Sequence, residues 1–434
     1  MEEFFTLTYF KNFFKSPTKR RLAENFFSLS TLQALNYLLP LITLPYLVRV
    51  LGATKYGLIA FAQAFIGYFQ ILTDYGFNLS ATREISINRE NKEKISEIFS
   101  SVMIIKFCLL FASLLLMSAI VFSFSKFRQD WPVYYLTFGM VLGQVLFPVW
   151  FFQGMERMKY ITFLNIIARG IFTICIFLFI KKMENYFYVP LINSLGYLVA
   201  GGLSLGIVFK KFGIKFQVPN IQAIKYQLKQ GWHVFISLLA ISLYTTSRIF
   251  IVGIFTNNTI TGYYAIAEKL MNVIQTFPLA SFLQAIYPRL VEIYAVSRKK
   301  AYYLMRKLQN VTIIVYLFLL LFLFYFADVI IEIITGSKAK ETILALRILL
   351  VALFFINSNA FRAQFLIVSG NYRAYSKIYV TVGISGLILL TILTYFYSYV
   401  GTAVGISMIE LIALMATLKY LKNIKSSFLE NTKP

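Results

Sequence analysis

The sequence predicts an all-α membrane protein of about twelve transmembrane helices, arranged as two pseudo-symmetric six-helix bundles around a central cavity. Of its 434 residues, 59% are hydrophobic and only 14% are charged, whereas a soluble chain carries about 25% charged residues. Mostly apolar segments recur along the whole chain, each long enough to cross a hydrocarbon core about 30 Å thick. They show no strand alternation, so they predict helices that satisfy their own backbone hydrogen bonds in lipid, and not a barrel.

The apolar segments divide the chain into regions with distinct expected roles. We predict spans at 26–48, 56–79, 99–122, 132–152, 161–180, 187–208, 232–255, 262–288, 309–333, 342–368, 375–397 and 400–420. The corresponding regions are a basic amphipathic tail (1–25), an N-terminal bundle (26–208), a cytoplasmic linker (209–231), a C-terminal bundle (232–421) and a cytoplasmic tail (422–434). The first tail has the composition of an interfacial helix, although a basic flank that only fixes topology is an equal alternative.

The basic residues orient these spans. The net charge is +24, and 28 of the 42 Lys and Arg residues fall in the two tails and in alternate loops, against 8 in the remaining loops. This asymmetry places both termini in the cytoplasm. Because the charge is topogenic and faces lipid headgroups, it does not indicate nucleic acid binding. The outer loops are short and leave no room for an extracytoplasmic domain.

A weak internal repeat relates the two halves. Tyr56–Phe65 (YGLIAFAQAF) and Thr261–Leu270 (TGYYAIAEKL) share one Gly and two Ala at the same places, 205 residues apart. Gly154–Arg157 (GMER) and Gly370–Arg373 (GNYR) match at an offset of 216. The matches follow equivalent spans of the same orientation, which predicts a parallel two-fold repeat.

Ionisable residues inside the predicted spans mark the candidate site. A charge at bilayer depth costs at least about 2.5 kcal/mol, so such residues face a partner or a cavity. The basic ones are Lys106, Arg169, Arg248, Lys269, Arg347 and Arg362, and the acidic ones are Asp74, Glu268 and Glu410. The basic excess favours an anionic ligand such as a phosphate. Two alternatives stay open: structural ion pairs between helices, and snorkelling of Lys106, Lys269 and Arg362 towards the interface.

The sequence gives little support to catalysis or metal binding. No phosphate-cradling Gly-rich loop is present. The single His233 cannot build a metal site, and Cys108 and Cys175 lie in apolar segments as small hydrophobic residues. We therefore expect no cofactor, no metal and no enzymatic activity.

One stretch carries a family resemblance. Leu44–Ser86 (LPYLVRVLGATKYGLIAFAQAFIGYFQILTDYGFNLSATREIS) resembles the opening of O-antigen flippases, the Wzx-type polysaccharide transporters of the multidrug/oligosaccharidyl-lipid/polysaccharide exporter superfamily. Phe152–Tyr160 (FQGMERMKY) resembles the loop after the fourth span of that family. The resemblance implies a bacterial inner-membrane protein that moves an oligosaccharide linked to undecaprenyl pyrophosphate from the cytoplasmic to the periplasmic leaflet. It also implies alternating access of two bundles, and a polysaccharide polymerase and chain-length regulator as partners.

Under this hypothesis the ionisable residues receive roles. The expected anion contacts are Arg248, Arg49, Arg83 and Arg169, followed by Arg347 and Arg362. Arg49 and Arg83 have an equal alternative as topogenic charges beside loops. Asp74, Glu268 and Glu410 are expected to serve proton or ion coupling, or to form gating pairs.

Two other functions remain open at this point. A related exporter could carry a peptidoglycan precursor or exchange drugs for cations, although a drug/cation exporter should have an acidic cavity. A membrane polymerase or glycosyltransferase is less favoured, because such enzymes need a sizeable outer loop.

Overall fold

The computed structural model describes residues 17–276, 279 and 281–430, and their regular secondary structure is helical throughout. Most of the predicted amphipathic tail, residues 1–16 of 1–25, lies outside the described residues. The elements are α2 (Pro17–Asp74), α3 (Phe77–Ile87), α4 (Lys92–Ser123), α5 (Ser125–Arg128), α6 (Trp131–Leu146), α7 (Val149–Gly154), α8 (Met158–Phe179), η2 (Met183–Phe187), α9 (Tyr188–Phe212), α10 (Ile221–Thr245), α11 (Ser247–Phe255), α12 (Asn258–Gln275), α13 (Ser281–Val296), α14 (Arg298–Tyr325), α15 (Ala327–Thr335), α16 (Lys340–Val368) and α17 (Tyr372–Glu430).

Helix length and hydropathy confirm the predicted class of an all-α membrane protein. Within the described residues, eight helical stretches are long and apolar enough to cross a membrane: Leu38–Ile87, Lys92–Ser123, Trp131–Gly154, Met158–Phe179, Met183–Phe212, Arg298–Tyr325, Lys340–Val368 and Arg373–Lys422. The first and last have 50 residues each, about 75 Å of helix at 1.5 Å per residue. The count of twelve spans stays a prediction, since the segments predicted at 232–255 and 262–288 fall on α10 to α13, which are not among these eight stretches.

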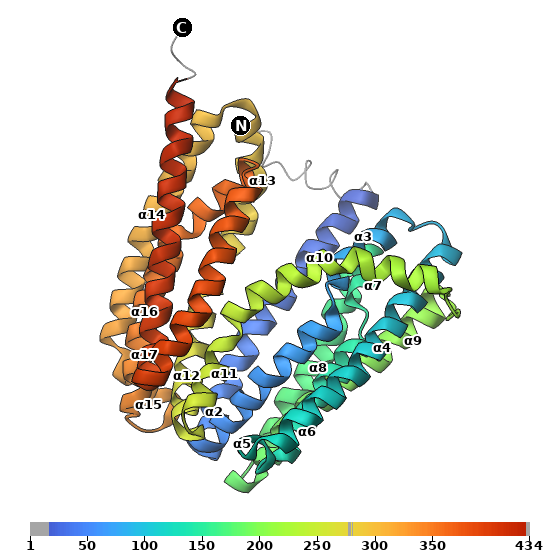
Figure 1. Cartoon of the computed structure of the whole chain (residues 1–434), viewed down its shortest axis with the longest axis horizontal. Helices are drawn as coiled ribbons and strands as arrows, with labels where there is room; N and C mark the ends of the chain where they lie inside the picture. The colour runs from blue at the N-terminus through green and yellow to red at the C-terminus, as the bar shows by residue number, and fades with distance from the viewer. Residues whose placement is uncertain (1–16, 277–278, 280, 431–434) are drawn as a thin grey trace. The chain divides into compact units, whose positions relative to one another are not determined.

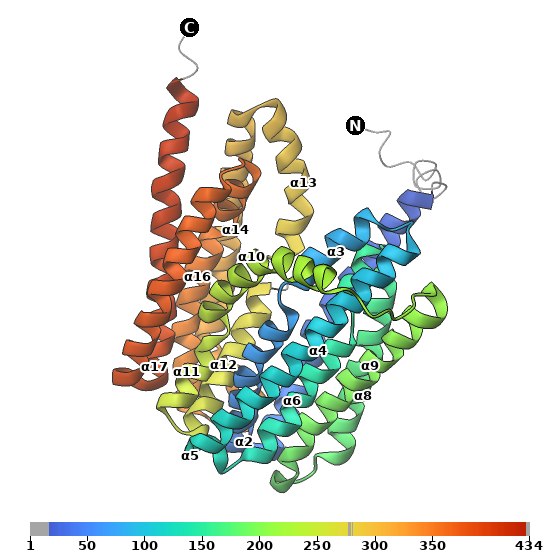
Figure 2. The ribbon, with the colours of Figure 1, turned by 45° about the vertical axis from the view of Figure 1, so that its right-hand side comes forward.

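Both 50-residue stretches are broken inside. α2 contains Gly52 in a left-handed conformation (φ 70°), which Gly adopts at little steric cost. α17 breaks at Tyr397 and Ser398, where Ser398 has φ 56°. The break at Gly52 divides α2 into 17–51 and 53–74, and the break at Tyr397 and Ser398 divides α17 into 372–396 and 399–430, so each piece is long enough to span a membrane. In α17 the two pieces run side by side (Figures 1 and 2).

Contacts group the residues into two compact units. The first joins the residues up to Thr43 with Phe65–Leu239, and the second joins Leu44–Ala64 with the residues from Ala240 onward. The middle of α2 therefore packs within the second unit. The division into bundles at 26–208 and 232–421, and a cavity between them, stay predictions.

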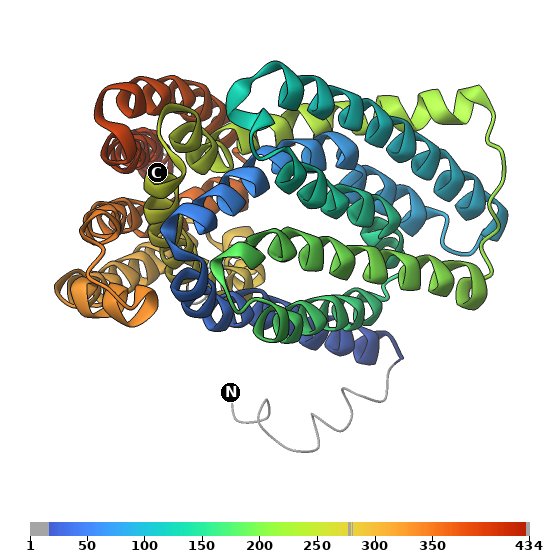
Figure 3. The ribbon, with the colours of Figure 1, turned by 90° about the horizontal axis from the view of Figure 1, so that it is seen from below.

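In the first unit, α9 packs against both α6 and α8, and the helices between α4 and α9 run alongside one another (Figures 1 and 3). Small residues allow this approach: a Cβ on Gly139 would meet Ser194, and one on Gly143 would meet the backbone of Tyr197. Ser204 donates to the carbonyl oxygen of Leu146 at 3.1 Å. Apolar side chains are as stable in lipid as in a helix interface. Close packing at small residues and hydrogen bonds of this kind therefore drive the association of the helices.

In the second unit, α16 packs against α12, α14 and α17. The two pieces of α17 are joined by a hydrogen bond between the hydroxyls of Thr394 and Thr402 at 2.7 Å. At the same bend, Gly401 lies against the carbonyl group of Leu393, where no side chain would fit. The core of this unit includes Met305, Phe361 and Phe365.

Within the second unit, the repeat-related segments of α2 and α12 cross each other. A Cβ on Gly57 would meet Asn258 O and the backbone of Gly262, and a Cβ on Gly262 would meet the backbone of Ala53. The hydroxyls of Thr54 and Thr259, also 205 residues apart, are 2.9 Å from each other. Residues 205 positions apart thus play the same part on the two sides of this contact. Such an exchange of equivalent residues is the mark of a two-fold axis. The contacts therefore follow the symmetry that the sequence repeat predicts.

The crossing predicts a strong effect of added volume. Gly262→Val would push a side chain into the α2 backbone, which cannot retract as a flexible side chain can, so we expect a loss of stability of at least about 1–3 kcal/mol. The measurement is the thermal midpoint of the detergent-purified protein. Gly202→Val is the control, because Gly202 lies on α9 where an added Cβ would have no neighbour within 4 Å. Equal midpoints for the two variants would contradict a close-packed crossing.

Candidate functional site

In the first unit, two of the intramembrane charges form a buried pair. Lys106 Nζ of α4 lies 3.7 Å from Asp74 Oδ1 at the end of α2, with side-chain exposures of 2% and 12%. Asn78 also donates to the same carboxylate oxygen, at 2.7 Å. The interpretation of Lys106 as a snorkelling residue is therefore wrong. With a carboxylate within reach, the ammonium group stays inside the packed unit and its charge is balanced there.

The second unit holds a similar pair. Arg248 Nη1 of α11 lies 3.7 Å from Glu268 Oε1 of α12, and both side chains are at most 7% exposed. The Glu268 Oε2 atom and the Tyr264 hydroxyl, one turn earlier on α12, are buried without a hydrogen-bond partner in the described part of the chain. Arg248 heads the anion contacts that the sequence predicts. In the structure, Glu268 already balances part of its charge.

A third basic residue is also paired. Arg347 Nη2 lies 2.5 Å from Asp328 Oδ2, and its guanidinium lies 5.3 Å from the centre of the Phe324 ring. Asp328 falls inside the predicted span 309–333, but the sequence analysis did not count it among the intramembrane acids. The excess of basic over acidic residues inside the predicted spans is therefore smaller than the six basic and three acidic residues named above suggest.

Two of the arginines inside the predicted spans have no carboxylate partner among the described residues. Arg169 lies near the middle of α8 and is half-buried, with no hydrogen bond or ion pair within the described ranges. Arg362 of α16 donates to the carbonyl oxygen of Ser358 on its own helix and lies within electrostatic range of Arg306. These two keep the most capacity to bind an anion.

The two arginines near loops have local partners. Arg49 is exposed and donates to the carbonyl oxygen of Ile333, in the last turn of α15. A cation at a helix C-terminus is favoured by the helix dipole and by the unpaired carbonyls. Arg83 has a 69% exposed side chain and contacts its neighbour Glu84 at 3.2 Å. Both residues thus lie at the ends of helices with local partners, and their alternative role as topogenic charges beside loops stays open.

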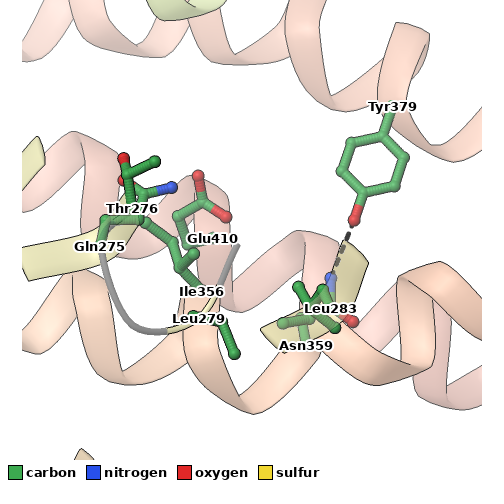
Figure 4. Close-up of a pocket in the computed structure, with 9 residues that line it drawn as sticks. Gln275, Thr276, Leu279, Leu283, Ile356, Asn359, Tyr379 and Glu410 are labelled. Carbon is green, nitrogen blue, oxygen red and sulfur yellow. Dashed lines mark hydrogen bonds between the residues drawn. The ribbon is translucent and has the colours of Figure 1, made fainter. Parts of the chain in front are cut away.

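Glu410 of α17 lines a cavity of about 300 Å³ inside the second unit (Figure 4). Four other polar side chains line the same cavity: Gln275, Thr276, Asn359 and Tyr379. Asn359 Nδ2 donates to the Tyr379 hydroxyl at 3.2 Å. Gln275 shares a polar stripe with Glu268 in the predicted span 262–288, whereas Thr276, Asn359 and Tyr379 carry no local signal in the sequence that would bring them to one cavity.

A buried amide shapes the helix that carries Asn359. Gln309 of α14 is completely buried and donates to the carbonyl oxygen of Asn357 at 2.8 Å. Its own carbonyl oxygen accepts from the backbone N–H of Phe361 at 3.1 Å. These two backbone groups are the partners of one ordinary i to i+4 bond of α16, so the Gln309 side chain is inserted into the helix ladder. Such an insertion bends a helix, here beside the cavity.

The motifs that carry the family resemblance contact each other in the first unit. The hydroxyl of Thr82 donates to the carbonyl oxygen of Trp150 at 3.1 Å. Arg89 donates to the carbonyl oxygen of Gly154 and pairs with Glu156 at 3.0 Å. Gly154 itself packs against Ile85, where a Cβ would lie 2.6 Å from the side chain. The end of the first motif therefore packs against the start of the second, where the Thr82 hydroxyl also lies 3.3 Å from Gln153 Oε1.

Comparisons with known proteins agree on family and fold. Residues 22–294 match a family described as "Polysaccharide biosynthesis protein". A protein of Escherichia coli (strain K12) named "Putative O-antigen transporter" is 30% identical over 94% of this chain and 99% of its own. One of the same name from Shigella dysenteriae is 26% identical over 92% of this chain and 100% of its own.

Solved structures share the fold at low identity. An inward-facing multidrug resistance MATE family transporter of the MOP superfamily has a TM-score of 0.74 at 14% identity, covering 91% of this chain and 96% of its own. An inward closed lipid II flippase has a TM-score of 0.71 at 14% identity, covering 91% of this chain and 87% of its own.

The buried pair in the first unit predicts a non-additive mutant set. Lys106→Met should cost about 3–5 kcal/mol because it leaves Asp74 buried without its cation, and Asp74→Asn/Lys106→Met should recover most of that loss. The measurement is the thermal midpoint of each purified variant. Lys94→Met is the control: it breaks the exposed pair with Glu97 and should cost less than about 1 kcal/mol. Additive single and double variants would show that Lys106 and Asp74 do not interact.

Proposed function

Since the chain belongs to the polysaccharide biosynthesis protein family, we propose that it is a flippase for a lipid-linked oligosaccharide, the repeat unit of O-antigen or a related surface polysaccharide. The observation that carries the proposal is the near full-length match to relatives named O-antigen transporters. The fold shared with a lipid II flippase is consistent with it. The chain thus acts as a membrane transporter and not as an enzyme.

The finer proposal concerns carrier, direction and location. The carrier is undecaprenyl pyrophosphate, and movement runs from the cytoplasmic to the periplasmic leaflet of the bacterial inner membrane by alternating access. Both termini are cytoplasmic, as the distribution of Lys and Arg indicates. A polysaccharide polymerase and a chain-length regulator act as partners on the periplasmic product.

Arginines without a carboxylate partner are the proposed contacts of the pyrophosphate. Arg guanidinium groups bind phosphate oxygens bidentately and stay charged when partly buried. Arg169 and Arg362 come first, because the described residues give them no carboxylate. Arg248 and Arg347 follow, since the cargo would compete with Glu268 and Asp328 for them. Arg49 and Arg83 rank last on account of their local partners.

The acidic residues divide into two proposed roles. Asp74 and Glu268 are paired with buried cations, and a pair that breaks in one conformation and forms in another is a gating device. Glu410 lines a cavity, and it is the proposed group for proton coupling. None of these roles requires a cofactor.

A leaflet-transfer assay tests the function. The purified protein is placed in liposomes with a fluorescent undecaprenyl-pyrophosphate oligosaccharide in one leaflet, and its arrival in the other is followed with and without a pH gradient. We expect protein-dependent transfer that falls at least about tenfold in Arg169→Ala, since loss of one charge-assisted contact to phosphate costs about 1.5–3 kcal/mol.

Arg289→Ala is the matched control. Arg289 is exposed and contacts Glu292 in the next turn of the same helix, so its loss should leave the transfer rate unchanged. Transfer that is equally slow in both variants would remove Arg169 from the cargo site. A wild-type protein that moves no lipid, or that alters it chemically, would overturn the flippase proposal.

A further inference from the structure

The cavity that contains Glu410 has the chemistry of a binding site and not of a packing defect. Polar side chains reach it from three helices: Gln275 from α12, Asn359 from α16, and Tyr379 and Glu410 from α17 (Figure 4). Leu279 forms part of its apolar wall. A cavity left by imperfect packing is lined by apolar groups and stays dry, whereas this one brings several hydrogen-bonding groups together.

Asn359 brings to this cavity a hydrogen-bond acceptor that has no partner among the described residues. The side chain is only 3% exposed, and its nitrogen donates to the Tyr379 hydroxyl at 3.2 Å. Its Oδ1 atom has no partner among the described residues. A buried amide oxygen without a donor costs about 1–3 kcal/mol. Tyr379, which accepts this bond, keeps its own O–H to donate. The two side chains therefore offer one acceptor and one donor next to each other.

The volume argues against a bare cation. About 300 Å³ equals roughly ten water molecules at about 30 Å³ each. Oxygen ligands hold a desolvated cation at about 2.3–2.6 Å and leave no such space. In the described part of the chain, no group of three or more His, Cys, Asp or Glu residues is placed to hold a metal ion. The volume is at the lower end of the range for small organic ligands, about 300–1,000 Å³.

We propose that this cavity binds one sugar ring of the cargo through its hydroxyl groups. Hydroxyls both donate and accept, which matches a set of two amides, a phenol and a carboxylate. The Glu410 carboxylate and Asn359 Oδ1 accept from ring hydroxyls, and the Tyr379 hydroxyl donates to one. The Leu279 side chain faces the C–H surface of the ring. This inference rests on the proposed function, because it takes the oligosaccharide as the cargo.

Such a site adds specificity that the pyrophosphate contacts lack. Every lipid-linked intermediate on this carrier has the same pyrophosphate, so arginines alone cannot distinguish one glycan from another. A site built to hydrogen-bond a hydroxyl rejects a ligand that lacks it, because its buried polar groups are then left unpaired. Gln309 acts as a positioning residue, since its insertion into α16 sets the path of the helix beside Asn359.

The test separates sugar binding from the phosphate and the lipid. The probe is the free repeat-unit oligosaccharide, released by mild acid from the lipid-linked intermediate of the source cells, and it is titrated into the full-length protein in nanodiscs. Binding is followed by saturation-transfer NMR, which detects weak sugar complexes. We expect Asn359→Ala to weaken binding about tenfold, the effect of about 1.4 kcal/mol. Tyr379→Phe, which removes only the hydroxyl, should weaken it about threefold and serves if Asn359→Ala does not fold.

Two variants act as matched controls. Asn357→Ala removes another buried amide of α16 that does not line the cavity, so it should change binding less than about twofold. Glu410→Gln keeps hydrogen bonding without the charge and should bind within about threefold of wild type, while Glu410→Leu should lose at least tenfold. If Glu410 held a cation, both Glu410 variants would lose the negative charge and would weaken binding equally.

Each outcome gives a decision. No binding of the oligosaccharide to wild type, equal effects of Asn359→Ala and Asn357→Ala, or equal loss in Glu410→Gln and Glu410→Leu would overturn the sugar site. If wild type still transfers the lipid-linked cargo between leaflets in those cases, only the sugar site fails. If wild type binds the oligosaccharide as expected but transfers no lipid, the sugar site stands and the flippase proposal fails.

Discussion

The cost of an unpaired polar group in hydrocarbon is the constraint on which the rest of this structure depends. Lys106 and Asp74 are almost fully buried together, and Arg248 and Glu268 repeat the arrangement in the second unit. Hydroxyls follow the same rule: Thr73, on α2 just before Asp74, donates to the carbonyl oxygen of Phe69 at 2.9 Å. Gln309 satisfies two backbone groups that its own insertion separates. Lipid offers no partner, so these polar groups find theirs inside the chain.

The same cost makes polar groups without a partner candidates for ligand binding. Asn359 Oδ1 has no partner among the described residues although the side chain is buried. Arg169 is half-buried in the middle of a helix without a carboxylate near it in the described ranges. Buried polar groups without a protein partner are the ones that a ligand can complete. The proposed sites for phosphate and sugar are built on this contrast.

Close backbone approach is the second organising feature. Gly57 and Gly262 leave no room for a Cβ at the α2–α12 crossing. Two equivalent segments that meet this way make a contact with its own two-fold symmetry, which the hydrogen bond between Thr54 and Thr259 follows. Since lipid does not drive apolar surfaces together, small residues that bring backbones close supply the dispersion energy. The repeat in the sequence is thus visible as a contact and not only as a similarity.

The sequence by itself determined the fold class, the family and the positions of the intramembrane charges, because hydropathy, basic flanks and the motifs of Leu44–Ser86 are local signals. Only the tertiary structure decided how those charges are used. It paired Lys106 with Asp74 and Arg347 with Asp328, left Arg169 without a carboxylate, and gathered Gln275, Asn359, Tyr379 and Glu410 around one cavity. Each of these groupings joins different helices, and the cavity brings together α12, α16 and α17, which are far apart in the chain. No local pattern records which faces of two helices meet, and packing alone sets that choice.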